Sequence, residues 1–318
     1  MQSSFREEPG KAKKSMKIRE LGEIGLIERI SKGIKLDRSV VKGIGDDAAV
    51  VAWGRDKYML YTCDMLVEDT HFTLRAATPF RIGWKAMARN ISDIAAMGGL
   101  PRYAVVSLGI NPGRPVSFVD GLYKGMKAAA NIFKVNIVGG DIARSKNTII
   151  NISLTGEVEK KNLVTRDGAK IGDFIFVTGT IGGSIKGKHL RFTPRVRQAR
   201  MLVENFTVNS MIDVSDGLFL DLGRILTASR VGARIERKSI PISKDAESLE
   251  KAITDGEDFE LLFTMGAREA KRFLKSKFTQ IDSGVTLIGE VTDKRHGYTL
   301  AAEDGKERKI TKKGYLHF

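Results

Sequence analysis

Apolar runs typical of buried β-strands alternate with helix-type stretches along this chain, and the alternation begins a second time in the C-terminal half. In the first half we expect strands over 47–53, 57–63, 103–110, 136–138 and 148–158, and helices over 18–34, 80–97 and 115–133. In the second half we expect strands over 174–177, 233–236, 259–264, 285–291 and 298–301, and helices over 195–206, 218–230 and 268–277. This order predicts the α/β (α+β) fold class.

The chain is expected to divide into two α/β domains. Its 318 residues are enough for two domains of roughly 100–200 residues each. A polar, Gly-rich stretch over 165–173 separates the two series of elements. We predict a frayed basic tail over 1–17, an N-terminal domain over 18–160 and a C-terminal domain over 161–318.

The sequence favours a cytoplasmic protein without membrane attachment. No apolar run approaches the ~20 residues that a membrane-spanning helix needs, and the basic tail lacks the apolar stretch of a secretory signal. The single cysteine, Cys63, excludes an internal disulfide, and one free thiol fits a reducing compartment better than a secreted scaffold.

The formal net charge of +15 is a reason to consider nucleic-acid binding, because a basic surface attracts phosphate whatever its sequence. The excess is spread over both halves of the chain, which makes a nucleic-acid partner unlikely. The densest basic stretch is Lys186, Lys188, Arg191, Arg195, Arg197 and Arg200. It is interpreted as a solvated basic face, with a phosphate-binding patch as the alternative.

Two Gly-rich motifs imitate nucleotide-binding loops. Residues 43–48 (GIGDDA) match the G-x-G-x-x-A pattern of dinucleotide-binding folds, but their two carboxylates would repel a pyrophosphate and a strand is expected to follow. Residues 182–189 (GGSIKGKH) differ from a P-loop at the last position, where His189 cannot supply a hydroxyl to Mg²⁺. Because Pro194 also interrupts the expected helix, we interpret this segment as a Gly-rich connection.

Acidic residues embedded in apolar or Gly-rich stretches are the main candidates for chemistry, because a buried carboxylate needs a cation. They are Asp46, Asp47, Asp64, Asp93, Asp141, Asp213, Asp216, Glu257 and Asp258. Taken singly, each has an ordinary explanation: Asp93 could pair with Arg89, Asp216 could cap a helix, and Asp141 could be a turn residue. Taken together they predict a site for several metal ions, and oxygen ligands without a His or Cys cluster favour Mg²⁺.

Seven segments of the chain, in this order, resemble the motifs of thiamine-monophosphate kinases of the aminoimidazole ribonucleotide synthetase-like superfamily. They are 43–50 (GIGDDAAV), 62–72 (TCDMLVEDTHF), 88–101 (ARNISDIAAMGGLP), 138–141 (VGGD), 163–173 (LVTRDGAKIGD), 213–222 (DVSDGLFLDL) and 255–263 (DGEDFELLF). The resemblance implies the two-domain fold of that superfamily, with an ATP- and metal-binding N-terminal domain. It also implies a homodimer whose N-terminal strands meet at the interface.

The activity that the resemblance implies is transfer of the γ-phosphoryl group of ATP to thiamine monophosphate, with ATP as co-substrate and several Mg²⁺ ions. No protein nucleophile is expected, because in-line phosphoryl transfer depends on positioning and charge neutralisation. One alternative is an ATP-dependent synthetase or dehydratase of the same superfamily with another small-molecule substrate. A remote alternative is a basic nucleic-acid-binding protein.

The resemblance also assigns roles to individual residues. The implied metal-site residues are Asp47, Thr62, Cys63, Asp64, Asp93, Asp141, Asp213 and Asp216. The implied ATP contacts are Gly140, Asp141, Arg166 and Ser215, and the implied thiamine phosphate contacts are His71, Glu257 and Tyr315. Cys63 departs from the more usual Thr, and a thiol is a poor Mg²⁺ ligand, so only its backbone carbonyl is expected to serve. The 184–194 stretch is also shorter than the corresponding segment of the family.

Overall fold

The computed structural model describes residues 16–280, 284–302, 304–310 and 314–317. It contains two compact units, one formed by the chain up to Leu36 with the last residues from Leu316, and one formed by Asp37–Tyr315. The first unit contains helix α1 (Ile18–Ser31), and the backbone N–H of His317 donates to Glu23 Oε2 at 2.8 Å. Most of the predicted basic tail, residues 1–15, lies outside the described residues.

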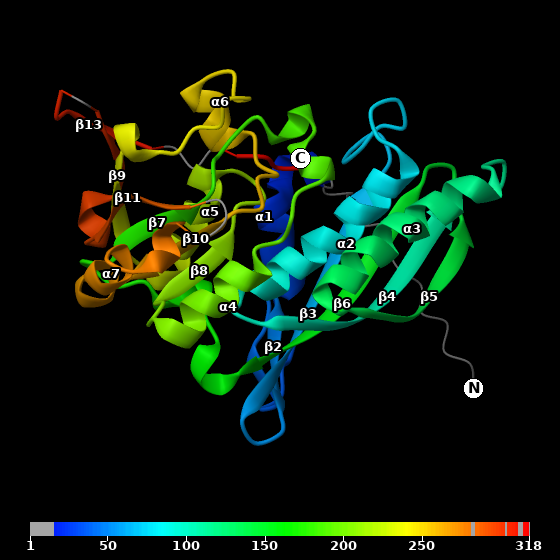
Figure 1. Cartoon of the computed structure of the whole chain (residues 1–318), viewed down its shortest axis with the longest axis horizontal. Helices are drawn as coiled ribbons and strands as arrows, with labels where there is room; N and C mark the ends of the chain where they lie inside the picture. Colours follow the sequence, from blue (N-terminus) through cyan, green and yellow to red (C-terminus); the bar gives the residue numbers. More distant parts are fainter. Residues whose placement is uncertain (1–15, 281–283, 303, 311–313, 318) are drawn as a thin grey trace, which may run out of the picture. The chain divides into compact units, whose positions relative to one another are not determined.

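The second unit begins with a six-stranded sheet in the order β1-β2-β3-β6-β4-β5. Its strands are β1 (Val40–Lys42), β2 (Ala49–Trp53), β3 (Lys57–Val67), β4 (Leu100–Ile110), β5 (Asn136–Arg144) and β6 (Ile149–Glu159). All neighbouring strands are antiparallel except the parallel pair β4 and β5. Helices α2 (Pro79–Ala96) and α3 (Val116–Phe133) lie over one face of this sheet (Figure 1).

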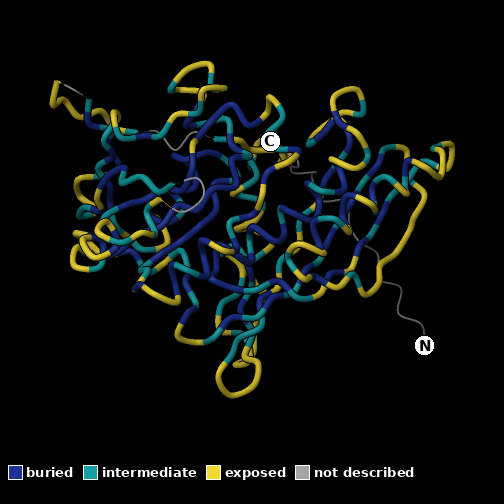
Figure 2. The backbone as a smooth tube through the Cα atoms, in the orientation of Figure 1, coloured by how far each residue is buried: buried dark blue, intermediate teal, exposed yellow. Residues whose placement is uncertain are grey.

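Helix α2 is the most deeply buried helix of this half (Figure 2). It begins where Thr78 Oγ1 accepts a hydrogen bond from the Arg81 backbone and Pro79 occupies the first turn. The two glycines Gly83 and Gly125 allow α2 and α3 to approach closely, because a Cβ at Gly83 would lie 1.9 Å from the Leu122 carbonyl oxygen. Burial of α2 against the sheet and α3 therefore fixes the side chains that it presents to the rest of the molecule.

A seven-stranded sheet follows, in the order β13-β12-β9-β11-β7-β10-β8. Its strands are β7 (Phe174–Thr178), β8 (Ser210–Asp213), β9 (Gly232–Glu236), β10 (Leu261–Met265), β11 (Val285–Thr292), β12 (Tyr298–Ala301) and β13 (Glu307–Lys309). Ile175 and Val177 pack with helix α5 (Leu218–Ser229) on one face, whereas Phe176 packs on the other face. Helices α4 (Val196–Asn205) and α7 (Ala267–Leu274) cover the face that carries Phe176. The apolar core on that face is continuous with the core around α2.

Most of the predicted elements are confirmed within a few residues, and the differences concern short or lengthened segments. Strand β5 extends to Arg144, far beyond the three residues expected. Strands β1, β8 and β13 and the short helix α6 (Leu249–Thr254) were not predicted. These pieces have only three to six residues, a length at which an apolar pattern is a weak signal.

A buried acid organises the Gly-rich connection that follows β7. Asp258 accepts hydrogen bonds from the Gly182 backbone at 2.9 Å and from Ser184 Oγ at 2.6 Å. Residues 184–186 and 188–190 form two short 3₁₀ turns, so the segment that imitates a P-loop does not lead directly into an α-helix. Burial raises the pKa of Asp258 to about 6, against the smaller effect of its hydrogen bonds and of Lys188.

This raised pKa predicts a pH-dependent stability difference. Because the folded protein holds the proton of Asp258 more tightly than the unfolded chain, this residue contributes to the free energy of unfolding. The contribution is fully present below the pKa of the unfolded chain and is lost as the pH rises through about 6. Asp258→Asn keeps an acceptor oxygen for Gly182 and Ser184 but cannot ionise. Between pH 4 and pH 7 the variant should therefore gain up to about 3 kcal/mol in free energy of unfolding relative to the native chain.

Urea unfolding at pH 4, 5.5 and 7 measures this difference. Asp245→Asn, which changes an exposed acid in a neighbouring loop, is the control. A difference between variant and native chain that stays constant over this range would contradict the ionisation of Asp258 as its cause.

Candidate active site

Three carboxylates from different parts of the chain converge at one point. Asp47, Asp93 and Asp213 each offer an oxygen, and these oxygens all lie within 4.8 Å of one another. Asp93 comes from α2, and Asp213 ends strand β8. Asp47 follows a turn in which Gly45 has φ of +116°, a backbone conformation that glycine adopts at little cost. The two halves of the second unit therefore contribute to a single acidic cluster.

The acidic cluster is electrostatically unfavourable without a cation. Burial raises the pKa of Asp93 well above its ordinary value, and the neighbouring carboxylates of Asp64, Asp213 and Asp47 raise it further. The pKa of Asp213 is raised in the same way, first by burial and then by Asp47. Thr62 Oγ1 donates to Asp93, and Ser92 Oγ donates to Asp213 at 2.5 Å. An all-oxygen donor set of this kind fits Mg²⁺, which would offset the repulsion.

Two arginines pair with the acids around this cluster. Arg166 Nη2 lies 2.5 Å from Asp47 Oδ1, and its backbone N–H donates to Asp46 at 3.1 Å. Burial and the Asp47 charge raise the pKa of Asp46 to about 6. Arg224 Nη2 lies 2.6 Å from Asp216 Oδ2, and Arg224 Nη1 lies 2.5 Å from Oδ1 of the buried Asp221. Asp216 is therefore held by an ion pair and does not cap α5 with its side chain.

Two of the three residues expected to contact thiamine phosphate are linked by a lysine. The fully buried Lys85 donates from Nζ to the His71 carbonyl at 2.9 Å and to Glu257 Oε2 at 2.7 Å. The Glu257 backbone, which has φ of +57°, donates to the Ser215 carbonyl at 2.7 Å. The Tyr315 backbone donates to the Asp216 carbonyl at 2.9 Å. The structure thus links His71 and Glu257 through Lys85 of α2, and it places Glu257 beside Ser215 and Tyr315 beside Asp216.

Sequence reasoning missed Lys85, Arg224 and Asp221, and it offered the wrong partner for one arginine. Arg89 was considered as a partner of Asp93, whereas its Nε lies 3.0 Å from Asp64 Oδ2. The roles of Lys85 and Arg89 are indicated in the sequence by their spacing from Asp93. The three residues follow one another at intervals of four and share one face of α2.

Asp141, Gly140 and Cys63 are not brought to the acidic cluster within this chain. Asp141 pairs in register with Ser107, and Ser107 pairs with Asn151, so these residues point to the sheet face opposite the helices. Cys63 also lies on that face, where its thiol is 3.2 Å from Asn151 Oδ1. Gly140 meets a packing requirement, because a Cβ there would lie 1.9 Å from the Val106 carbonyl oxygen.

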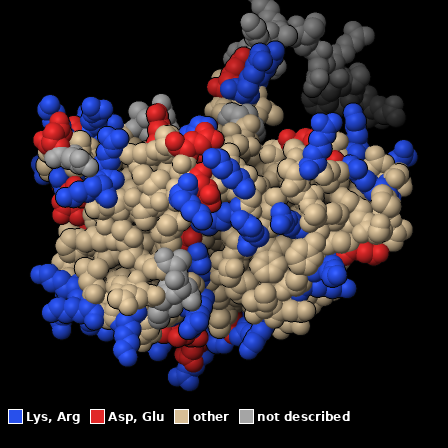
Figure 3. Space-filling view, turned by 45° about the horizontal axis from the view of Figure 1, so that its top comes forward, with Lys and Arg blue, Asp and Glu red and all other residues tan. Residues whose placement is uncertain are grey.

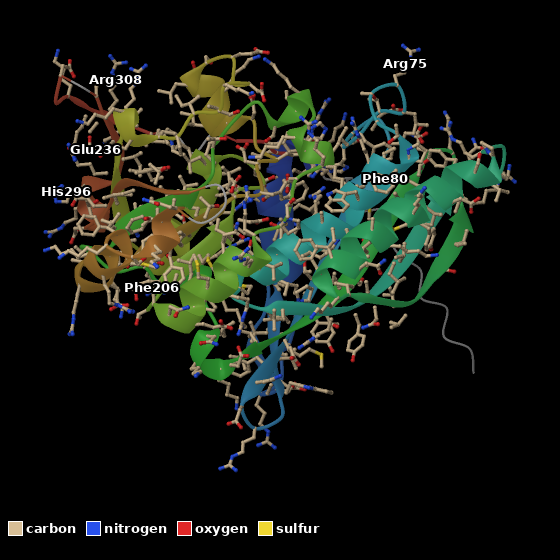
Figure 4. All side chains as sticks on the ribbon, in the orientation of Figure 1. Arg75, Phe80, Phe206, Glu236, His296 and Arg308 are labelled. Atoms are coloured by element: carbon tan, nitrogen blue, oxygen red, sulfur yellow. The ribbon has the colours of Figure 1, made fainter. Side chains whose placement is uncertain are left out.

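The other features that could hold a ligand are less suited to chemistry. A cavity of about 390 Å³ lies beside α4 and α7, near the labelled Phe206 in Figure 4. Its Arg272 already stacks 4.4 Å from the centre of the Phe206 ring and pairs with Glu269.

Lys and Arg are distributed over the face in Figure 3 with uncharged surface between them, rather than in one continuous stripe. Among the described residues no helix combines the length and apolarity needed to cross a bilayer.

Comparisons with known proteins cover both halves of the second unit. The family described as "AIR synthase related protein, N-terminal domain" matches residues 45–158, and its C-terminal counterpart matches residues 155–301. A thiamine-monophosphate kinase of Rhodopirellula baltica is 39% identical over 87% of this chain and 92% of that protein. One from Aquifex aeolicus is 35% identical over 95% of this chain and 100% of that protein. The solved structure "AaThiL complexed with AMPPCP and TMP" has a TM-score of 0.82 at 33% identity, covering 96% of this chain and 100% of that one.

Proposed function

The chain belongs to the thiamine-monophosphate kinase family, phosphotransferases with the AIR synthase related fold, and we propose that it phosphorylates thiamine monophosphate with ATP in a direct, Mg²⁺-dependent in-line transfer. The product of this reaction is thiamine diphosphate. ATP as co-substrate is supported by the relative whose structure is complexed with AMPPCP and TMP.

The observation that carries the mechanism is the convergence of Asp47, Asp93 and Asp213 within 4.8 Å. These carboxylates would hold Mg²⁺, together with Asp64 and Asp216 beside them. When bound, Mg²⁺ supplies positive charge that screens the phosphates of the two substrates from each other. Arg166, which the Asp46 and Asp47 carboxylates hold in place, adds charge-assisted contacts to the ATP phosphates.

The chain's own residues bind and orient rather than attack. The acceptor is a phosphate oxygen that is largely ionised near neutral pH, so a general base is dispensable. His71 Nδ1 accepts a hydrogen bond from the Val67 backbone at 3.0 Å, which commits that nitrogen to the loop. Glu257 and the half-exposed Tyr315 supply a negative charge and an aromatic ring, both suited to the cationic thiazolium.

We propose in addition that two copies of the chain associate through the open face of the first sheet. This face is the one opposite α2 and α3, and it exposes Tyr61, Met65, Tyr103 and Val105. An apolar sheet face of this kind is typical of a surface that another protein covers. Asp141 lies on the same face, so its expected metal and ATP contacts would be made at the interface rather than within one chain.

Val105→Lys should therefore weaken the dimer. A lysine in the middle of a closed apolar interface would lose its solvation, so the apparent molecular mass should fall toward the 35.0 kDa of one chain. Size-exclusion chromatography with light scattering measures this change. Val116→Lys, at the exposed start of α3 and away from the open face, is the matched control. An unchanged mass for Val105→Lys would show that this face is not the interface.

Incubation of the purified protein with ATP, Mg²⁺ and thiamine monophosphate, followed by chromatography of the thiamine species, tests the proposed reaction. Thiamine diphosphate should form only from the monophosphate, and a chelator should abolish it. ATP binding without that product would instead favour another chemistry of the superfamily. Tight, salt-dependent binding to nucleic-acid probes would favour the remote alternative.

A further inference from the structure

Arg89 occupies the middle of a line of functional side chains on α2. Four residues before it, Lys85 contacts Glu257, and four residues after it, Asp93 joins the acidic cluster. Because side chains at this spacing share a helix face, Arg89 lies between the proposed metal ligands and the residue proposed to contact thiamine. Its Nε is 3.0 Å from Oδ2 of Asp64, which is the acidic residue of β3.

The guanidinium of Arg89 has unused hydrogen-bonding capacity. Its Nη1 is buried and makes no hydrogen bond within the part of the chain that the structure describes. Its Nε also lacks a well-directed hydrogen bond, but it is engaged in the ion pair with Asp64. Buried arginine nitrogens are rarely left in this condition, because each unsatisfied donor carries a desolvation cost. The buried Nη1, beside an ion-paired Nε, indicates that an acceptor group from outside the chain completes the site.

Arg89 is cationic, because a guanidinium is not deprotonated in proteins. It lies among several acids, which are Asp64, Glu257, Asp93 and Asp216. The same acids would repel an anion that arrived alone. A phosphate is therefore accommodated when cations neutralise the acidic cluster, and Arg89 is then the nearest permanent positive charge on α2.

We propose that Arg89 binds the phosphate group of the acceptor substrate, a role that rests on the proposed function. The acceptor phosphate must lie between the site of ATP activation and the thiamine ring. Arg89 lies between the groups proposed for those two ends, Asp93 and Glu257. A guanidinium offers parallel N–H donors that match phosphate oxygens, which also gives the site a means to prefer thiamine monophosphate over thiamine.

Binding measurements on Arg89→Gln test this role independently of turnover. Calorimetry in the presence of Mg²⁺ and a non-hydrolysable ATP analogue gives the Kd of thiamine monophosphate and of thiamine. The variant should bind thiamine monophosphate roughly 10- to 100-fold more weakly, which is the scale of a lost hydrogen bond to a charged group. Its affinity for thiamine should stay within about twofold, so the preference for the phosphorylated ligand should largely disappear.

Arg89→Lys is the companion variant, because it retains the charge and the pairing with Asp64 while losing the planar donors. It should show an intermediate loss of affinity for thiamine monophosphate, and it keeps the test available if Arg89→Gln does not fold. An unchanged preference for thiamine monophosphate in the folded variants would overturn the proposal. So would an equal loss for both ligands, or a change confined to the Mg²⁺ requirement, since either would mean that Arg89 only orients Asp64.

The native chain separates this proposal from the proposed function. If the native chain binds neither form of thiamine and yields no thiamine diphosphate, the proposed function fails and the role of Arg89 fails with it. If the native chain performs the reaction and the variants retain their preference, only the role of Arg89 is overturned.

Discussion

Replacing Asp93 by Asn should lower kcat by about 1,000-fold or more while the protein remains folded. Asp93 shares the acidic cluster with Asp47 and Asp213, so its loss removes one of three converging charges that would hold the metal. Removing a single preorganised electrostatic group from an active site costs on the order of 100- to 1,000-fold in rate, and a metal ligand lies at the upper end of that range. Steady-state kinetics with a Mg²⁺ titration measure the effect.

The same substitution should leave the free energy of unfolding unchanged or higher in the absence of metal. Burial and neighbouring carboxylates raise the pKa of Asp93, which means that the ionised form is unfavourable in the folded protein. Asn retains the size of the side chain and removes that repulsion. Asp120→Asn, on the exposed surface of α3, is the control for expression and assay. Near-native turnover in Asp93→Asn would contradict the metal-site assignment.

Lys85→Met should cost about 2–4 kcal/mol in free energy of unfolding and weaken binding of thiamine monophosphate. The ammonium group is fully buried, and it is hydrogen-bonded to Glu257 and to the His71 carbonyl. Removing one partner of a buried ion pair costs about 3–5 kcal/mol, and we reduce this figure because the Glu257 side chain is 22% exposed. Urea unfolding gives the stability, and KM for each substrate gives the functional effect.

A second substitution tests the cause of that loss. If the cost arises from leaving the Glu257 carboxylate without its cation, Lys85→Met combined with Glu257→Gln should recover part of the stability. KM for thiamine monophosphate should rise more than KM for ATP, because His71 and Glu257 belong to the acceptor side of the proposed site. Native stability in Lys85→Met, or equal changes in both KM values, would contradict this arrangement.

The sequence was sufficient to predict most helices and strands, because the helices show a clear helical apolar spacing and most strands are apolar runs bounded by turn residues. It also identified Asp47, Asp93 and Asp213 as unusual acids, since each lies in an apolar or Gly-rich motif. Their convergence was not derivable from spacing along the chain, because it depends on β8 meeting α2 across the two halves. The resemblance to a family supplied that step.

Other features of the site could not be read from the sequence for physical reasons. A lysine on an amphipathic helix ordinarily extends to solvent, so nothing in the local pattern around Lys85 indicates that it is buried against Glu257. Asp141 illustrates the opposite case. Its motif resembles that of a ligand, yet the register of β5 against β4 directs it to the other sheet face, and strand register depends on long-range pairing.

The stripe of Lys85, Arg89 and Asp93 on α2 also limits how this protein can change during evolution. Each step of four residues advances about 6 Å along the helix axis, so the helix itself sets the separation between the metal end and the thiamine end of the site. Inserting or deleting one residue between Lys85 and Asp93 would rotate one end by about 100° relative to the other. The length of this helical segment is therefore not free to vary.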